Sequence, residues 1–203
     1  VVRGGGEFLA RAAGDFENFL AERPDITTRP KWREQLMEVT RHLLAAKWPL
    51  RIHATYDESI GHIVGVFEEA DKLEKEAGRM GFDGIRWAID HAETALPETI
   101  ARVRKLGGGF ATQSRMAYAG EYFLERYGKH MAGRAPAFAD MLEAGVTVGL
   151  GSDATRVSSY NPWVTLYWAV TGKTVGGTPM LSERHRLSRQ KALELHTVGS
   201  AWF

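Results

Sequence analysis

"VTVGLGSD", residues 146–153, runs from a short apolar stretch directly into a carboxylate. Residues 146–150 have the length and the apolar character of a buried strand. Asp153 follows, and a polar loop then leads to Pro162. One interpretation is that the strand ends in an active site that uses this carboxylate. The other is that Asp153 caps the next helix or forms an Asx-turn, and the rest of the chain has to decide between them.

Strand-like stretches recur along the chain and alternate with amphipathic helical patterns. We predict strands at about 49–53, 85–90, 109–113 and 146–151, and helices at 7–21, 31–48, 59–76, 97–105, 118–127, 135–144, 161–171 and 188–197. Strands that alternate with helices through short connections are parallel and are joined by helical crossovers. The sequence therefore predicts an α/β fold with four parallel strands that are adjacent in chain order.

Composition narrows the class of protein. The chain has 203 residues, 44% of them hydrophobic, and a net charge of +1, which suits one globular domain or part of a larger one. The absence of cysteine excludes disulfides and thiolate metal sites. No basic stripe and no run near the roughly 18 apolar residues of a membrane span stand out, so we expect neither a nucleic-acid nor a membrane partner. We expect a soluble protein, cytoplasmic or exported, and the compartment stays open.

Polar residues follow the predicted strands where each one ends. These ends read His53, His91, Gln113 with Ser114, and Asp153. Parallel α/β folds build their sites at the carboxyl ends of strands, and two imidazoles with a carboxylate are suitable ligands for a divalent metal such as zinc. Each histidine could instead be a hydrogen-bonded structural residue. The recurrence of such residues at three strand ends favours the metal site.

Further polar residues lie near these strand ends. We expect Arg115 and Gln113 to contact a polar group of a substrate, although Arg115 could equally hold a loop carboxylate. Tyr160 is expected to form a wall of the pocket. Glu93, two residues after His91, is expected to support it as an outer partner of a metal ligand. Strand alternation should point Asp90 to the opposite face, away from the site.

Three motifs carry a resemblance to a known family. "RIHATYDESI" (51–60), "WAIDHAE" (87–93) and "VGLGSDATRVSSYNPW" (148–163) resemble the fifth, sixth and eighth strand ends of the amidohydrolase superfamily, most closely its amidohydrolase-3, YtcJ-like branch. The resemblance implies that residues 1–203 form the C-terminal half of a TIM-type (β/α)₈ barrel, about strands five to eight with their helices and the preceding helical region. The N-terminal barrel half and the family's β-rich accessory domain would then lie outside this sequence.

The resemblance also implies a chemistry. His53, His91 and Asp153 would be metal ligands, and Asp153 would also be the general base for a metal-bound water that attacks a C–N bond of an amide, a cyclic amide or an amidine-like group. The cofactor would be a divalent metal, with zinc expected, as one or two ions. The partner would be a small-molecule substrate, whose identity these residues do not specify.

Two elements of the family pattern are not found in this sequence. No His-x-His pair occurs anywhere in the chain, and the region that would match the metal-bridging lysine of strand four, "VVRGGGE" (1–7), offers Arg3. A guanidinium is permanently protonated and cannot bind a metal. We therefore expect the missing ligands upstream of Val1, or a mononuclear site without the lysine.

These departures leave alternatives open. The chain is expected to supply half of a metal-dependent hydrolase and to be inactive by itself, with metal bound weakly or not at all. It could instead be a non-catalytic half-barrel that binds metal or a small molecule weakly, or part of a lyase or isomerase on the same scaffold. Half a barrel leaves open sheet edges, so we expect it to pair with a copy of itself or with the missing half.

Overall fold

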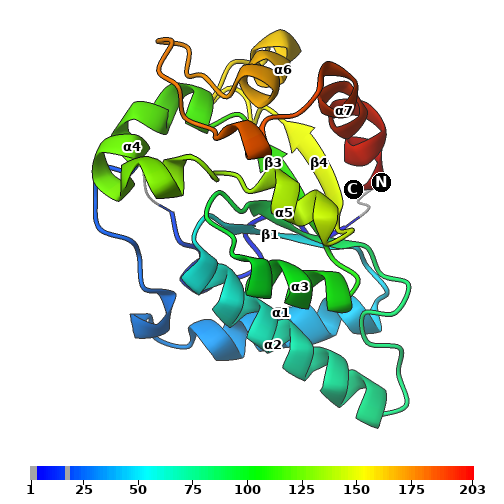
Figure 1. The fold of residues 1–203 in the computed structure, drawn as a ribbon. Helices are drawn as coiled ribbons and strands as arrows, with labels where there is room; N and C mark the ends of the chain where they lie inside the picture. The colour runs from blue at the N-terminus through cyan, green and yellow to red at the C-terminus, as the bar shows by residue number, and fades with distance from the viewer. Residues whose placement is uncertain (1–3, 17–18) are drawn as a thin grey trace.

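A computed structural model describes residues 4–16 and 19–203 (Figure 1). Its centre is one sheet of four parallel strands in the order β1-β2-β3-β4, as the sequence predicted. The strands are β1 (Leu50–Ala54), β2 (Trp87–His91), β3 (Gly109–Gln113) and β4 (Thr147–Gly151). Each lies within about two residues of its predicted position. The α/β class and the half-barrel order of elements are confirmed.

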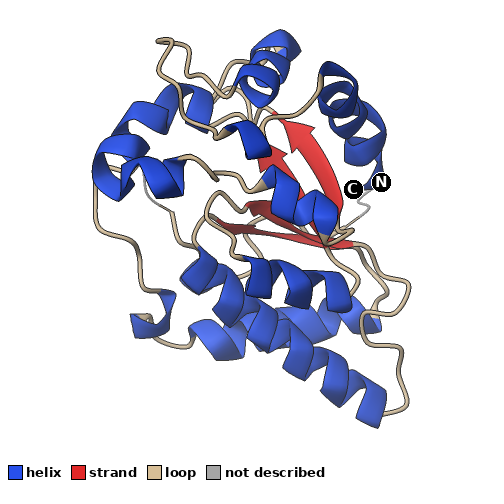
Figure 2. Ribbon diagram, in the orientation of Figure 1, coloured by secondary structure: helices blue, strands red, loops and turns tan. Residues whose placement is uncertain are grey.

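Helices connect the strands and cover the outer face of the sheet (Figure 2). The α-helices are α1 (Trp32–Ala45), α2 (Asp57–Glu76), α3 (Pro97–Lys105), α4 (Met116–Ala132), α5 (Phe138–Glu143), α6 (Pro162–Thr171) and α7 (Arg189–Glu194). Short 3₁₀ turns lie at η1 (Arg11–Ala13), η2 (Ile26–Thr28), η3 (Glu183–His185) and η5 (Ser200–Trp202), and a π-helical turn at η4 (Leu195–Gly199). These elements match the predicted helices from residue 31 onward.

The apolar stripes of the helices supply the core. Phe67 on α2 is fully buried and packs against Phe82 and Trp87, with ring centroids 5.3 and 5.2 Å away. Burial of such large rings is the main stabilising contribution in a domain of this size. The core therefore lies between the outer face of the sheet and its helices, and leaves the inner face for the site.

The inner face of the sheet is identified by its register. His53, Asp90, Ala111 and Gly149 are consecutive Cα partners across the four strands, so their side chains share one face. Asp90, Ala111 and Gly149 line a cavity of about 240 Å³ on this face. On β3 and β4 most of the inward positions are glycine or alanine, so the inner face is hollow near its middle.

The segment before α1 does not form the predicted helix at 7–21. Among the described residues of 7–21 only η1 is helical, and Gly14 has extended backbone angles. Phe8 and Phe16, two of the apolar residues in this range, are 61% and 38% exposed. The segment is held instead by polar contacts to the sheet, which are described below. Arg3 lies outside the described residues.

No helix among the described residues is long and apolar enough to cross a membrane.

Candidate metal centre

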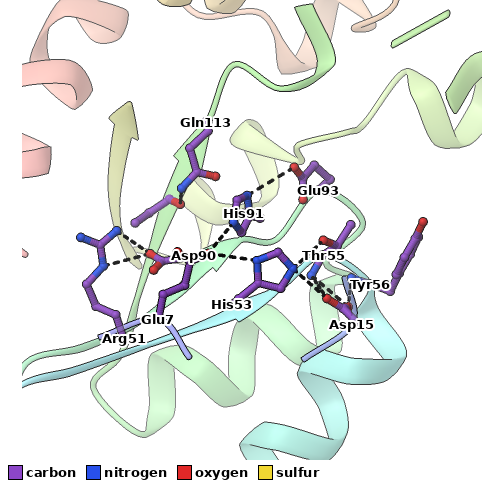
Figure 3. A network of polar contacts seen from close by, with 11 residues as sticks. Glu7, Asp15, Arg51, His53, Thr55, Tyr56, Asp90, His91, Glu93 and Gln113 are labelled. Atoms are coloured by element: carbon purple, nitrogen blue, oxygen red, sulfur yellow. Dashed lines mark hydrogen bonds and ion pairs between the residues drawn. The ribbon is translucent and has the colours of Figure 1, made fainter. Parts of the chain in front are cut away.

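The two predicted histidines meet at the carboxyl edge of the sheet (Figure 3). His53 is the fourth residue of β1 and His91 the last residue of β2. Their ring centroids lie 4.2 Å apart, and the residues are only 6% and 3% exposed. Two strands therefore bring together imidazoles that are 38 residues apart in the sequence.

The backbone at the end of β2 determines where His91 points. In the register, Asp90 and not His91 is the partner of His53, so regular alternation would turn His91 to the outer face. His91 has a φ of 80°, in the left-handed region that non-glycine residues rarely adopt. Its ring nevertheless lines the same cleft as His53.

The expectation for Asp90 was wrong for the same reason. Its side chain lies on the inner face and accepts hydrogen bonds from Arg51 Nη2 at 2.6 Å and Nε at 3.0 Å. Burial raises the pKa of this carboxyl group, although Arg51 opposes the shift. Asp90 thus forms an ion pair with the partly exposed Arg51 on the inner face, rather than lying away from the site.

A third side chain, Glu7, joins the histidines. Its segment lies against β1 like a short extra parallel strand: Arg51 N–H donates to the Gly5 carbonyl at 3.0 Å, and His53 N–H donates to the Glu7 carbonyl at 3.1 Å. Glu7 Oε1 lies 3.0 Å from His53 Nδ1 and 2.9 Å from His91 Nε2. These contacts hold the pKa of Glu7 well below its usual range, His53 having the larger effect.

Asp15 contacts the other side of the His53 ring. Its Oδ1 lies 3.2 Å from His53 Nε2, and its carboxylate accepts the backbone N–H groups of Thr55 and Tyr56 at 3.0 and 2.9 Å. Burial alone would lower the pKa of His53, but Asp15 and Glu7 outweigh it and raise this pKa to about 9. Without a metal, His53 is therefore an imidazolium held between two carboxylates at neutral pH.

Glu93 lies close to the ring of His91. Its Oε1 is 3.9 Å from His91 Nδ1, and the residue is 1% exposed. Within the described part of the chain, neither carboxylate oxygen of Glu93 has a hydrogen-bond partner, nor does His91 Nδ1. The contact is longer than a hydrogen bond, so Glu93 is close to His91 without fixing its ring.

The cluster lies at the bottom of a cleft of about 1150 Å³. The cleft is lined by Glu7, Phe8, Arg11, Phe16, Ala21, His53, His91, Arg115, Asp153, Arg156 and Val157. Asp153 is exposed and has a φ of 53°. It shares the cleft but does not belong to the group whose ligand atoms lie within 4.8 Å of one another, which is Glu7, His53 and His91.

Capping does not explain Asp153. The N-cap of α6 is Asn161, whose side chain accepts the backbone N–H of Trp163 at 3.0 Å. The loop between Asp153 and Asn161 is fixed at Ser158, whose hydroxyl lies 2.8 Å from that of Ser114, in the turn after β3. The carboxylate therefore projects from a loop that is bonded to the neighbouring strand end.

The three residues that the sequence analysis assigned to the substrate pocket lie in three different places. Arg115 lines the cleft, is 7% exposed, and lies with its guanidinium carbon 4.1 Å from the ring centroid of Phe19. Gln113 lines the smaller cavity on the inner face and donates from Nε2 to the Ala111 carbonyl at 2.8 Å. Tyr160 is 79% exposed and is not among the described residues that line the cleft.

The donor set is one that a divalent metal can use. Two imidazole nitrogens and one carboxylate oxygen converge, and this mixture suits zinc and other first-row transition metals. His53 also has a carboxylate, Asp15, 3.2 Å from its second nitrogen, which is the usual arrangement around metal-bound imidazole, whereas Glu93 lies 3.9 Å from the second nitrogen of His91. The three described side chains therefore fit a metal ion, with room in the cleft for further ligands.

Sequence reasoning missed Glu7 and Asp15. Both lie in the segment that was read as a helix, and three consecutive glycines before Glu7 conceal any strand pattern. Glu7 could have been found from the family pattern, because the strand-four ligand was expected within "VVRGGGE" and the only carboxylate in that stretch is Glu7. Asp15 has no sequence signal, since its contacts depend on the fold.

Comparison with known proteins identifies the family. The sequence profile of the amidohydrolase family matches residues 2–203. The chain belongs to this family. None of the curated proteins matches it. The family resemblance inferred from the three strand-end motifs is therefore confirmed.

Several solved structures of other proteins have the same fold as this amidohydrolase chain. An uncharacterised metal-dependent hydrolase from Pyrococcus horikoshii OT3 is 23% identical, with a TM-score of 0.68, over 83% of this chain and 32% of that one. One from Pyrococcus furiosus is 22% identical, with a TM-score of 0.66, over 87% and 34%. The atrazine chlorohydrolase TrzN of Arthrobacter aurescens TC1, complexed with zinc, is 19% identical, with a TM-score of 0.50, over 84% and 34%. The chain spans about a third of the length of these structures.

Proposed function

We propose that this chain supplies half of the catalytic centre of a metal-dependent hydrolase that acts on C–N bonds. The observation that carries the proposal is the convergence of Glu7, His53 and His91 from three separate segments on one point in a cleft. Membership of the amidohydrolase family supports a hydrolase. The amide, cyclic amide or amidine-like nature of the bond is part of the proposal.

The proposed cofactor is one divalent metal ion or two, with zinc as the first candidate. Imidazole and carboxylate donors suit zinc, and the TrzN structure with the same fold is complexed with zinc. When bound, such an ion supplies Lewis-acid polarisation of the scissile group and lowers the pKa of water. Glu7, His53 and His91 would hold it, and Asp153 is proposed as a further ligand.

Asp153 is also proposed as the general base. Asp153 is exposed on the wall of the cleft and does not cap α6, whose N-cap is Asn161. It is held on a loop that is hydrogen-bonded to the end of β3. A carboxylate in this place can take the proton of the water that attacks the substrate and return it to the leaving amine. Its left-handed backbone is the kind of local strain that concentrates at functional sites.

The substrate is proposed to be a small molecule bound above the histidines. Arg115 offers a buried guanidinium to a polar or anionic group of that molecule, with Gln113 deeper on the inner face. The Phe8 and Phe16 rings stack with centroids 4.7 Å apart and can cover an apolar part. Tyr160 would have to move to reach the cleft, so we give it the smallest role.

The remaining ligands are proposed to come from outside the 203 residues. The chain has no His-x-His pair and spans about a third of its structural neighbours. We propose that it works as the C-terminal half of a closed barrel, with the other half in the same polypeptide, called the full-length polypeptide below. Without that half, the open sheet edges would favour self-association or pairing with it.

The proposal is tested by three variants of the full-length polypeptide. Asp153→Asn should reduce amide hydrolysis by about 10²- to 10⁴-fold with the metal content retained in large part, because water loses its proton acceptor. His53→Ala and His91→Ala should lower both metal content and rate. Near-normal turnover in Asp153→Asn, or an unchanged metal content in both histidine variants, would contradict it. A metal-free polypeptide with no turnover would favour the non-catalytic half-barrel.

A further inference from the structure

Three arginines line the cleft that contains the two histidines, and two of them, Arg11 and Arg156, have no role in the function described so far. Arg11 belongs to η1, Arg115 stands at the N-cap of α4, and Arg156 lies in the loop between β4 and α6. Three segments that are far apart in the sequence thus bring guanidinium groups to one cleft. A guanidinium does not lose its proton in proteins, so these side chains are permanent positive charges.

Positive charge exceeds negative charge among the described residues that line the cleft. The three arginines share it with two carboxylates, Glu7 and Asp153, both of which are proposed metal ligands. A divalent ion would balance these two carboxylates by itself. Within the described part of the chain, no carboxylate lies within 4.0 Å of the guanidinium of Arg11 or Arg156. Because a cleft lined by one sign of charge concentrates ligands of the opposite sign, this cleft favours an anion.

Arg115 is the most firmly held of the three arginines. It is only 7% exposed, and its guanidinium carbon lies 4.1 Å from the ring centroid of Phe19. Phe19 is buried in turn and packs edge-on against Phe123, with ring centroids 5.1 Å apart. The backbone carbonyl of Arg115 accepts hydrogen bonds from the N–H groups of Tyr118 and Ala119, both at 3.0 Å. A guanidinium held in this way before a ligand arrives loses little conformational entropy when it binds.

The same cleft has an apolar wall beside the histidines. The ring of Phe16 lies against His53, with ring centroids 4.2 Å apart, and Phe8 stacks on Phe16 at 4.7 Å. Both phenylalanines are exposed where they line the cleft, so an apolar group of a ligand that covered them would be stabilised by burial of their rings. Because Phe16 touches a proposed metal ligand, that apolar group would lie next to the proposed reaction centre.

We propose that the substrate is an anionic amide, with an apolar group on one side of the scissile C–N bond and an oxyanion, a carboxylate or a phosphate, on the other. The apolar group packs on Phe8 and Phe16, and the oxyanion binds the three arginines. Arg115 makes the direct contact, since a planar guanidinium binds an oxyanion through two parallel hydrogen bonds, and the exposed Arg11 and Arg156 add to the attraction. This substrate class rests on the hydrolase function proposed above, but anion binding is measurable without a metal and without turnover.

The test compares two probes that differ by one charge. Hippurate has a benzoyl group for the phenylalanines and a carboxylate for the arginines, whereas hippuramide has a neutral amide in place of the carboxylate. Isothermal titration calorimetry with the metal-free full-length polypeptide measures both affinities, so that no contact between carboxylate and metal contributes. We expect hippurate to bind about 10- to 100-fold more tightly than hippuramide. The phosphonate analogue of hippurate, (benzamidomethyl)phosphonate, shows in the same titration which oxyanion the cleft prefers.

Three variants assign this preference to residues. Arg115→Met keeps an unbranched apolar stem, loses the charge and should remove most of the preference for hippurate. Arg11→Gln and Arg156→Gln should each lower it about 2- to 5-fold, because exposed charge pairs are weak. Both positions are exposed, so these two variants keep the test informative if Arg115→Met does not fold. The matched control is Arg104→Gln, since Arg104 is equally exposed but lies on α3, outside the residues that line the cleft, and should leave the preference unchanged.

The outcomes separate this proposal from the hydrolase function. Equal affinities for hippurate and hippuramide, or a preference that every folded cleft variant retains, would overturn the anionic substrate. The same holds if the Zn²⁺-loaded polypeptide hydrolyses hippuramide with a higher kcat/KM than hippurate, a result that would leave the hydrolase standing. A preference for hippurate that the cleft variants lower, with no amide hydrolysis after Zn²⁺ loading, would keep the anion site and refute the hydrolase.

Discussion

The four strands and the segment at residues 4–16 are held in the structure by different forces. The strands and their helices are fixed by buried apolar side chains such as Phe67, Trp87 and Ile89. The segment has two exposed phenylalanines, contributes the small side chains of Ala10 and Ala13 to the core, and is held mainly by hydrogen bonds and ion pairs that Glu7 and Asp15 make with the end of β1. Apolar packing builds the scaffold here, whereas polar contacts complete the site, and the two can be perturbed separately.

The largest expected effect tests the scaffold. Phe67→Ala removes a fully buried ring between Phe82 and Trp87 and should lower the free energy of unfolding by about 3–5 kcal/mol. Phe16→Ala, in the segment, removes a ring that is 38% exposed and should cost less than about 1 kcal/mol. Urea denaturation of both variants measures the difference. Equal losses would show that the segment depends on apolar packing after all.

The second prediction concerns metal binding, for which a change in the segment should have a larger effect than a change in the scaffold. Glu7→Gln in the full-length polypeptide removes a charged ligand and should weaken Zn²⁺ binding by more than about 100-fold, since the loss of an outer partner alone costs 10- to 100-fold. Phe67→Ala, while folded, should bind Zn²⁺ as the wild type does. Titration with a competing chelator gives both affinities. A Glu7→Gln protein with wild-type affinity would remove Glu7 from the metal centre.

The third prediction concerns pH. The pKa of His53 is raised from 6.5 to about 9, so its stabilising contribution is complete below pH 6.5 and is lost as the pH rises through 9. The metal-free protein should therefore lose at most about 3 kcal/mol of unfolding free energy between pH 6 and pH 9.5. His53→Gln should lose much less over the same range. Parallel pH dependences of the two proteins, from urea denaturation, would contradict the ion pairs between the segment and β1.

The smallest expected effect compares the two histidines. Glu93→Gln changes a carboxylate that lies 3.9 Å from His91 Nδ1 and fixes nothing, so Zn²⁺ affinity should fall less than about tenfold. Asp15→Asn should have the larger effect. Both affinities come from the same chelator titration, and a larger loss in Glu93→Gln would reverse the order of importance that the distances give.

The sequence predicted the scaffold well for a physical reason. Apolar periodicity determines which face of an element is buried, so the strands and the helices after residue 31 could be located, and with them His53, His91 and Asp153 in one cleft. The sign of a backbone dihedral angle leaves no such periodic pattern in the sequence. The left-handed φ of His91, which brings its ring to the inner face with Asp90, therefore could not be read from the sequence.

The structure of the segment at residues 4–16 could not be predicted, because it does not depend on apolar periodicity. Its order comes from single polar contacts with residues about 40 positions away, such as Asp15 with Thr55 and Glu7 with His53. Periodic patterns report only local burial. Phe8 and Phe16 of the segment imitate a helical stripe although they line a cleft.

The small residues on the inner face of β3 and β4 make room for an aromatic ring from the end of this same chain. Gly109, Ala111, Gly149 and Gly151 face inward on β3 and β4, and a Cβ atom at Gly149 would lie 2.6 Å from the Phe203 ring. The interior of an eight-stranded barrel is filled by layers of bulky side chains. Phe203 of this chain supplies one such side chain, because its ring lies over Gly109 and Gly149, and a larger residue at either position would collide with it.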